Sequence, residues 1–146
     1  MKELLQSGLL LAALAVLPLV GCGGGDQMVS VSGTITWQGM PIAQGTVAFM
    51  PLERVEDGPS RMATGRIESD GTYRLSTFGH FDGAMPGQYR VAISDTGEFP
   101  FEALETEQPQ TNDGVLPARY AIAHEGGLTA EVPADRGSVE IDFTLP

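Results

Sequence analysis

From residue 29 onward, short runs of alternating apolar and polar residues are separated by glycine or proline turns. This period of two places successive side chains on opposite faces of a strand, so that one face can be buried. After residue 22 no apolar run reaches helix length, and 19 glycines and 10 prolines favour turns. The sequence therefore predicts an all-β fold, with about seven antiparallel strands packed as a β-sandwich. The clearest strand patterns are "VSVSGTIT" (29–36), "GTVAFMP" (45–51) and "QYRVAIS" (88–94).

A short motif, Gly-x-Tyr-Arg-apolar, occurs twice, as "GTYRL" (71–75) and "GQYRV" (87–91), each time after a turn. One interpretation is a binding site that presents two tyrosines and two arginines together. The other is structural: each tyrosine begins a strand, buries its ring and uses its hydroxyl for one hydrogen bond. We favour the structural interpretation, which turns Tyr73 and Tyr89 inward and Arg74 and Arg90 toward water.

Three further segments carry local predictions. Gly33 interrupts the first strand and indicates a bulge or a close approach of another strand. "LPARYA" (116–121) predicts one helical turn with Pro117 near its start. "LTAEV" (128–132) and "VEIDFTL" (139–145) flank a turn and predict a closing hairpin. Three residues of its second strand are expected on one face: Val139, Ile141 and Phe143.

The first 22 residues have a different character. Residues 9–20 form an apolar block after Lys2, shorter than the roughly 20 residues that span a bilayer, which indicates an export signal. "LVGC" (19–22) resembles the bacterial lipobox, where lipoprotein signal peptidase cuts before the cysteine. The resemblance implies a diacylglyceryl thioether on Cys22 and an acylated amino terminus. Cys22 is the only cysteine, so it has no internal disulfide partner, and a buried free thiol is the alternative.

These features divide the chain into three parts. Residues 1–21 are predicted to be a helical signal peptide, residues 22–28 a lipidated cysteine with a glycine-rich tether, and residues 29–146 the β-sandwich domain. Two or three acyl chains anchor a protein stably where one does not. We therefore expect an exported protein held in the cell envelope, at the outer membrane or on the periplasmic face. Gly23 after the cysteine favours the outer membrane.

Charge narrows the range of partners and chemistries. The net charge is −11, and removal of residues 1–21 leaves it unchanged, because this segment holds one lysine and one glutamate. Such a surface repels phosphate backbones, so nucleic acid is not an expected partner. Lys2 is the only lysine, which excludes a catalytic lysine from the mature domain. The acidic loop, residues 95–116, is interpreted as solvated, with a cation site as the alternative. Three short sequences there and in other turns combine an acid with glycine: "ESDG", "FDGA" and "TNDG".

Catalytic patterns are not evident. His80 and His124 stand in different predicted loops without a second ligand at metal-binding spacing, and no Gly-x-Ser-x-Gly elbow occurs. We therefore predict a non-catalytic protein without a cofactor or metal. Two alternatives remain open. One is an enzyme with an unrecognised site, built from both histidines and the acidic loop. The other is a carbohydrate-binding or calcium-dependent adhesion domain whose platform comprises three aromatic residues: Trp37, Phe78 and Phe81.

The order of segments resembles bacterial lipoproteins with a carboxypeptidase regulatory-like domain, which are abundant in planctomycetes. The resemblance runs from about residue 28 to the end, on "VSGTITWQGMPIAQGTVAFMP" (31–51), "ATGRIESDGTYRLST" (63–77) and "GAMPGQYRVAIS" (83–94). It implies a transthyretin-like, or prealbumin-like, β-sandwich that serves as a folding or docking module and is not itself a peptidase. Its expected partner is an unidentified envelope protein or glycan, besides the membrane that holds the lipid on Cys22.

Overall fold

A computed structural model describes residues 27–53, 61–96 and 114–146. This part of the chain is all-β, as predicted, with one short 3-10 helix, η2 (Ala118–Ala121). The predicted signal peptide, including its helix, and Cys22 lie outside the described residues. No helix in the described ranges is long and apolar enough to cross a membrane. The strands are β1 (Ser30–Trp37), β2 (Met40–Pro41), β3 (Gly45–Pro51), β4 (Ala63–Ile67), β5 (Thr72–Arg74), β6 (Gly87–Ser94), β7 (Leu128–Val132), β8 (Ser138–Glu140) and β9 (Phe143–Leu145).

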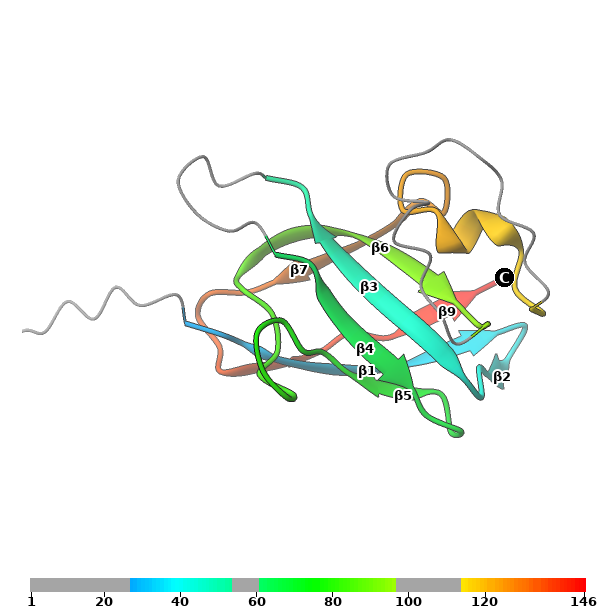
Figure 1. Cartoon of the computed structure of the whole chain (residues 1–146), viewed down its shortest axis with the longest axis horizontal. Helices are drawn as coiled ribbons and strands as arrows, with labels where there is room; N and C mark the ends of the chain where they lie inside the picture. Colours follow the sequence, from blue (N-terminus) through cyan, green and yellow to red (C-terminus); the bar gives the residue numbers. More distant parts are fainter. Residues whose placement is uncertain (1–26, 54–60, 97–113) are drawn as a thin grey trace, which may run out of the picture.

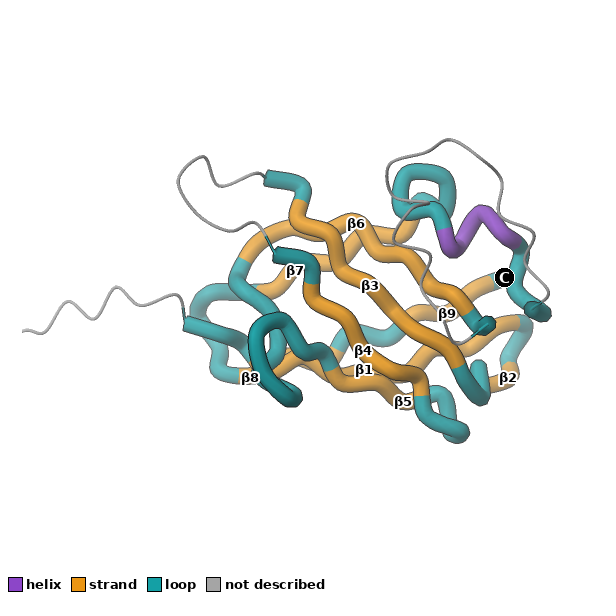
Figure 2. Tube along the Cα trace, viewed as in Figure 1, coloured by secondary structure: helices purple, strands orange, loops and turns teal. Residues whose placement is uncertain are grey.

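Seven strands follow one another across a single sheet in the order β2-β1-β5-β4-β3-β6-β7, and every neighbouring pair is antiparallel. The sheet curls, so that β3 and β4 pass in front of β1 and β9 in the view of Figure 1. Figure 2 shows the same path with the connecting loops gathered at the two ends of the strands. A single sheet that folds over its own inner face in this way is compatible with the predicted β-sandwich.

The prediction of a closing hairpin at the carboxyl end is wrong. β7 pairs with β6, whereas β8 and β9 pair in parallel with β1 on the edge that β5 leaves free. Alternation reveals which face of a strand is buried, but it does not identify the neighbouring strand. The expected inner face is nevertheless formed, because Phe143 is buried and both Val139 and Ile141 pack partly buried against the core.

The core is built from the inner faces of these strands. Phe49, Tyr73, Tyr89 and Phe143 form an aromatic cluster, with neighbouring ring centroids 5.8–6.5 Å apart. Rings at such distances in tilted or edge-on contact add to the stabilisation that burial alone gives. Aliphatic side chains from the same alternating positions surround them, among them Val31, Ile35, Val47, Val91 and Ile93, all at most 1% exposed.

The outer face of β6 is also partly covered. Ala92 and Ser94 alternate with the core residues of this strand, yet they are 0% and 1% exposed. Ala48 on β3, Ala92 and Ala123 form a second small cluster, because the chain after η2 crosses this face. Small side chains permit that close approach, which the period-two pattern did not predict.

Candidate functional site

Tyr73 has a structural role. Its side chain is 1% exposed, and its hydroxyl donates a hydrogen bond of 2.6 Å to the carbonyl oxygen of Ile141, in the break between β8 and β9. Gly33 makes this possible, because a Cβ on Gly33 would collide with that carbonyl group. The close strand approach predicted at Gly33 is therefore confirmed.

Asp142 supplies a hydrogen-bond acceptor in the same break between β8 and β9. Where the backbone leaves the parallel ladder, its Oδ1 accepts the Thr34 N–H at 2.7 Å and replaces the missing carbonyl. Burial raises the pKa of Tyr73, and the negative charge of Asp142 raises it further. The phenol therefore stays protonated and remains a hydrogen-bond donor near neutral pH.

Tyr89 is the counterpart of Tyr73 on β6. It is 2% exposed, and its hydroxyl donates to the Met85 carbonyl oxygen at 2.6 Å. Burial raises its pKa as well. Arg74 and Arg90 are exposed on the opposite faces of their strands. The structural interpretation of the repeated motif is thus confirmed, and the alternative Tyr/Arg binding site is not formed.

The two histidines are not brought together. His80 stacks on Phe81, with ring centroids 3.8 Å apart, in the loop between β5 and β6. His124 follows η2, where its Nε2 lies 3.9 Å from Glu125 Oε1. Figure 1 places these two segments at opposite ends of the domain. Within the described ranges no three His, Cys, Asp or Glu side chains are grouped as metal ligands.

Asp70 and Asp82, the acids of two predicted turns, accept hydrogen bonds from residues of those turns. Asp70 Oδ1 accepts hydrogen bonds from the Thr72 hydroxyl at 2.6 Å and from the Thr72 N–H at 3.1 Å. The bond from the hydroxyl lowers the pKa of Asp70 most, and the bond from the N–H lowers it further. Asx turns of this kind account for acids beside glycines without a cation. The acid of the third such sequence, Asp113 of "TNDG", and most of the acidic loop 95–116 lie outside the described residues, so the cation site there stays a hypothesis.

Asp95, at the end of β6, is buried and 4% exposed. Its Oδ2 accepts the N–H groups of Val115 and Leu116 at 2.5 and 2.9 Å, while Oδ1 has no hydrogen-bond partner among the described residues. The carboxylate thus joins the two described ends that flank residues 97–113. Sequence reasoning grouped this acid with the solvated loop and missed its burial.

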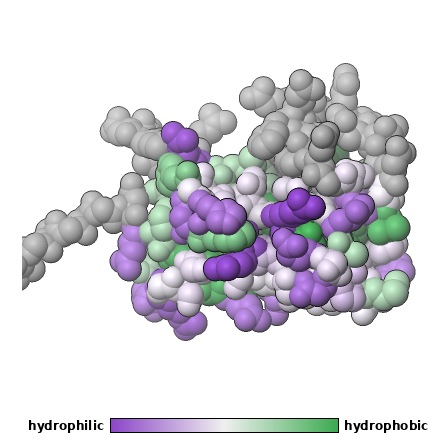
Figure 3. Space-filling view, turned by 60° about the horizontal axis from the view of Figure 1, so that its bottom comes forward, coloured by the Kyte–Doolittle hydropathy of each residue, from purple (hydrophilic) through white to green (hydrophobic). Residues whose placement is uncertain are grey.

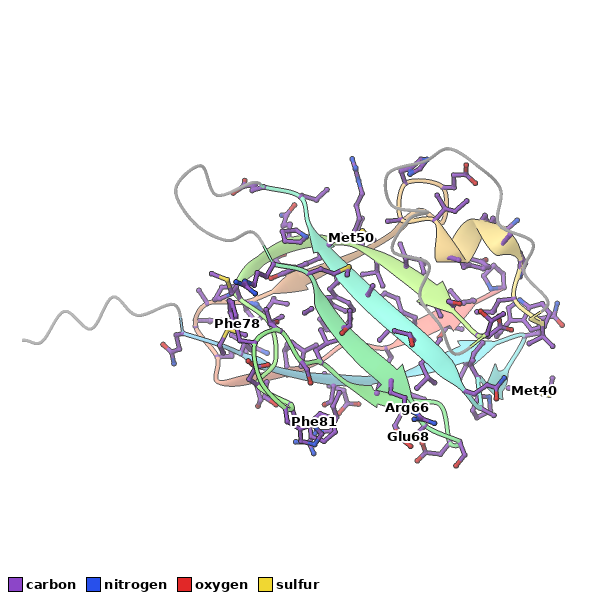
Figure 4. All side chains as sticks on the ribbon, in the orientation of Figure 1. Met40, Met50, Arg66, Glu68, Phe78 and Phe81 are labelled. Carbon is purple, nitrogen blue, oxygen red and sulfur yellow. The ribbon has the colours of Figure 1, made fainter. Side chains whose placement is uncertain are left out.

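The predicted three-residue aromatic platform is not assembled. Trp37 lies in the β1–β2 hairpin, where its Nε1 donates to the Pro146 carbonyl at 3.1 Å. Its strand partner Met40 lies at the right of the domain in Figure 4, whereas Phe78 lies at the left and Phe81 at the lower edge, left of centre. The two phenylalanines, in contrast, belong to one loop, residues 77–83, which we call the aromatic loop.

The aromatic loop is held in one shape by its own polar groups. Asp82 accepts the N–H groups of Thr77, Phe78 and Gly79 at 2.7–2.9 Å. Desolvation raises the pKa of Asp82, but these backbone hydrogen bonds together outweigh it and hold the pKa below its usual value. The Thr77 hydroxyl donates to the Gly83 carbonyl at 2.7 Å, which closes the loop at its base.

Both phenylalanine rings of the loop are exposed, and the guanidinium group of an arginine lies over each of them. Phe78 is 53% and Phe81 40% exposed. The Cζ of Arg61 lies 5.1 Å from the centroid of the Phe78 ring, and that of Arg74 lies 4.6 Å from the centroid of the Phe81 ring. Such cation–π pairs orient the rings and place positive charge beside them. Sequence reasoning did not connect Arg61 with Phe78, since 17 positions and two strands separate them.

A cavity of about 100 Å³ opens beside the loop, lined by residues that include Pro51, Arg61, Met85 and Gln88. Pockets for small molecules usually enclose about 300–1,000 Å³. The exposed rings with their two arginines are therefore the better candidate for a functional surface than this cavity.

The fold and this surface define an all-β domain with a preformed, exposed aromatic loop. No protein-family model matches the chain, and no curated protein shows significant similarity to it. The resemblance to lipoproteins with a carboxypeptidase regulatory-like domain therefore remains a prediction.

Proposed function

We propose that this chain is an exported lipoprotein, anchored through Cys22, whose β domain acts as a non-catalytic interaction or structural module in the cell envelope. The observation that carries the proposal is "LVGC" at the end of an export-type apolar block, with Cys22 as the only cysteine. Among the described residues, Val29 is the first that pairs with another segment, and it follows only seven positions after Cys22. A lipid on Cys22 would thus hold the domain close to a bilayer.

A non-catalytic role fits the environment of the polar groups that the sequence offers for chemistry. The hydroxyls of Tyr73 and Tyr89 donate to backbone carbonyls, and the carboxylates of Asp70 and Asp82 accept hydrogen bonds within their own turns. Groups engaged in this way stabilise loops and strands. The all-β curled sheet also agrees with the transthyretin-like domain that the resemblance implies, and that likeness is part of the proposal.

Metabolic labelling with radioactive palmitate tests the anchor. We expect the wild-type protein to incorporate the label and to sediment with membranes. The Cys22→Ser variant should incorporate none and should appear in soluble fractions, because serine cannot form the thioether. Thermal unfolding of both proteins, followed by circular dichroism, checks that the domain is equally folded. A wild-type protein that stays unlabelled would refute the proposal.

Separation of inner and outer membranes then tests the localisation expected from Gly23. Enrichment in the outer membrane supports the prediction made from this residue. Enrichment in the inner membrane contradicts the sorting prediction and leaves the lipid anchor intact.

A further inference from the structure

The aromatic loop lies at the end of the domain where the chain enters its first strand. Val29 exchanges two backbone hydrogen bonds of 2.9 Å with Ala84, which follows the loop directly. In Figure 1 the start of β1, the loop between β5 and β6 and the turn between β7 and β8 share this end. The β1–β2 hairpin and η2 lie at the other end. We refer to the end that holds the start of β1 and the aromatic loop as the entry end.

Three of the five large apolar side chains that are exposed among the described residues belong to the entry end, and the other two, Met40 and Val115, lie at the far end. Among the described residues, the large apolar side chains that are most exposed are Met40, Leu52, Phe78, Phe81 and Val115. Phe78 and Phe81 belong to the aromatic loop. Leu52 lies at the same end, because its N–H donates to the Gln88 carbonyl near the start of β6. Solitary apolar side chains are ordinary on protein surfaces, whereas several at one end indicate a contact surface.

Apolar and charged side chains alternate closely on the surface around the aromatic loop. Figure 3 turns the lower side of Figure 1 forward, and hydrophilic and hydrophobic side chains are interspersed there. Each phenylalanine of the loop has one arginine beside its ring. The loop's own carboxylate, on Asp82, is engaged with three backbone N–H groups. A ring beside a guanidinium matches the boundary of a bilayer, where acyl chains meet phosphates.

The length of the chain between Cys22 and the domain decides which end can reach that boundary. Cys22 and Gln27, the first described residue, are five positions apart, which spans at most about 18 Å. β1 runs from Ser30 at the entry end to Trp37 at the far end, a length of about 23 Å at the usual rise of a strand. A lipid on Cys22 therefore keeps the entry end nearest the bilayer.

From this placement we propose that Phe78 and Phe81 insert into the lipid headgroup boundary and, with Arg61 and Arg74, fix the orientation of the domain on the membrane. The inference rests on the lipid anchor proposed above. The loop is already shaped by its internal hydrogen bonds, so little conformational entropy is lost on contact. The tether adds to this by keeping the loop at high local concentration beside the bilayer.

A glycan is the other chemistry that suits exposed aromatic rings, but the surroundings favour lipid. Sugars stack on open ring faces, whereas Arg74 lies over a face of Phe81 and His80 is stacked on the same ring. Phenylalanine also lacks the hydrogen-bonding atom that tyrosine or tryptophan offers to a hydroxyl group. These features leave the ring edges as the most available apolar surface, which suits shallow insertion.

The test uses the full lipidated protein, purified in detergent and reconstituted into phosphatidylcholine vesicles with brominated acyl chains, which quench nearby indoles. The wild type has one tryptophan, Trp37, which pairs with Met40 at the far end. In Phe78→Trp we expect the emission of the introduced indole to fall by about half or more, because interfacial side chains lie about 5–10 Å into the boundary. Phe81→Trp repeats the measurement at the second ring.

Met40→Trp is the matched control, since Met40 is 63% exposed at the far end. Its indole, like native Trp37, should keep its emission in brominated vesicles. Co-flotation of protein with vesicles is measured in parallel. Protein that co-floats without quenching at either phenylalanine position overturns this inference, leaves the anchor in place and is the result that a glycan occupant predicts. Wild-type protein that does not co-float refutes the anchor, and the inference fails with it.

Discussion

At the residue scale, Gly33 determines how closely β8 and β9 can join β1. The Ile141 carbonyl occupies the space that a Cβ on Gly33 would need, and the same carbonyl accepts the Tyr73 hydroxyl. Asp142 then supplies the acceptor for the Thr34 N–H. One missing side chain thus permits an interruption of the ladder in which the polar groups involved are still paired.

We expect Gly33→Ala to lower the free energy of unfolding by about 3 kcal/mol, because the new methyl group displaces the Ile141 carbonyl and weakens its bond to Tyr73. Gly137→Ala is the control, since among the described residues, its two chain neighbours apart, no heavy atom lies within 4 Å of the position of a Cβ there. Its effect should stay within about 0.5 kcal/mol. Urea unfolding followed by Trp37 fluorescence measures both. Equal stability of the two variants would contradict this account of Gly33.

At the element scale, the aromatic loop depends on a single carboxylate. Three consecutive N–H groups point at Asp82, so the loop has no need of a regular hydrogen-bonding partner elsewhere. The charged form accepts these hydrogen bonds best, which is why they lower its pKa. The shape that presents Phe78 and Phe81 is therefore linked to the protonation of Asp82.

The sign of the pH dependence follows from this lowered pKa. The stabilisation of the loop is complete above the ordinary value of 3.8 and is lost as the pH falls through the lower folded value. We expect the amide resonances of Thr77, Phe78 and Gly79 to titrate together, with a midpoint below 3.8, in NMR spectra. Asp82→Asn should abolish this titration, whereas Asp70→Asn should preserve it. A midpoint at or above 3.8 would show that the hydrogen bonds do not stabilise the carboxylate.

At the scale of the whole molecule, the chain closes its core by returning to its beginning. β9 pairs with the second half of β1, and Phe143 and Leu145 are 6% and 1% exposed. The last strand therefore contributes to the central aromatic cluster, where Phe143 contacts both Phe49 and Tyr73. In the predicted hairpin the same strand would have paired with β7.

Deletion of residues 143–146 tests how much β9 contributes to the core. Loss of two buried side chains costs about 5 kcal/mol or more, a large part of the 5–15 kcal/mol that stabilises a typical domain. We expect the truncated protein to melt at a much lower temperature or to remain unfolded, as measured by circular dichroism. Deletion of Pro146 alone, which is exposed, removes the hydrogen bond from Trp37 Nε1 and should cost only about 1 kcal/mol. A shortened protein that melts like the wild type would exclude a central role for β9.

The sequence was informative about single strands and turns. Alternation placed Tyr73 and Tyr89 on inner faces, as observed. Gly33 indicated a close approach, and Pro117 one helical turn, which the structure shows as a 3-10 helix. The sequence analysis predicted an aromatic platform of Phe78, Phe81 and Trp37. A sequence shows which residues are aromatic, but it does not show how far apart they lie in the fold. It gave no indication that Arg61 and Arg74 lie beside the two rings.

The sequence by itself thus determined the all-β class, the turns and the inward side of the most clearly alternating strands, because these depend on residues within a few positions of one another. Only the tertiary structure decided that β8 and β9 join β1, that Ala123 covers β6, and that the aromatic loop lies at the entry end. Backbone hydrogen bonds between strands are the same for nearly every residue type, so the choice of partner depends on packing of the entire core.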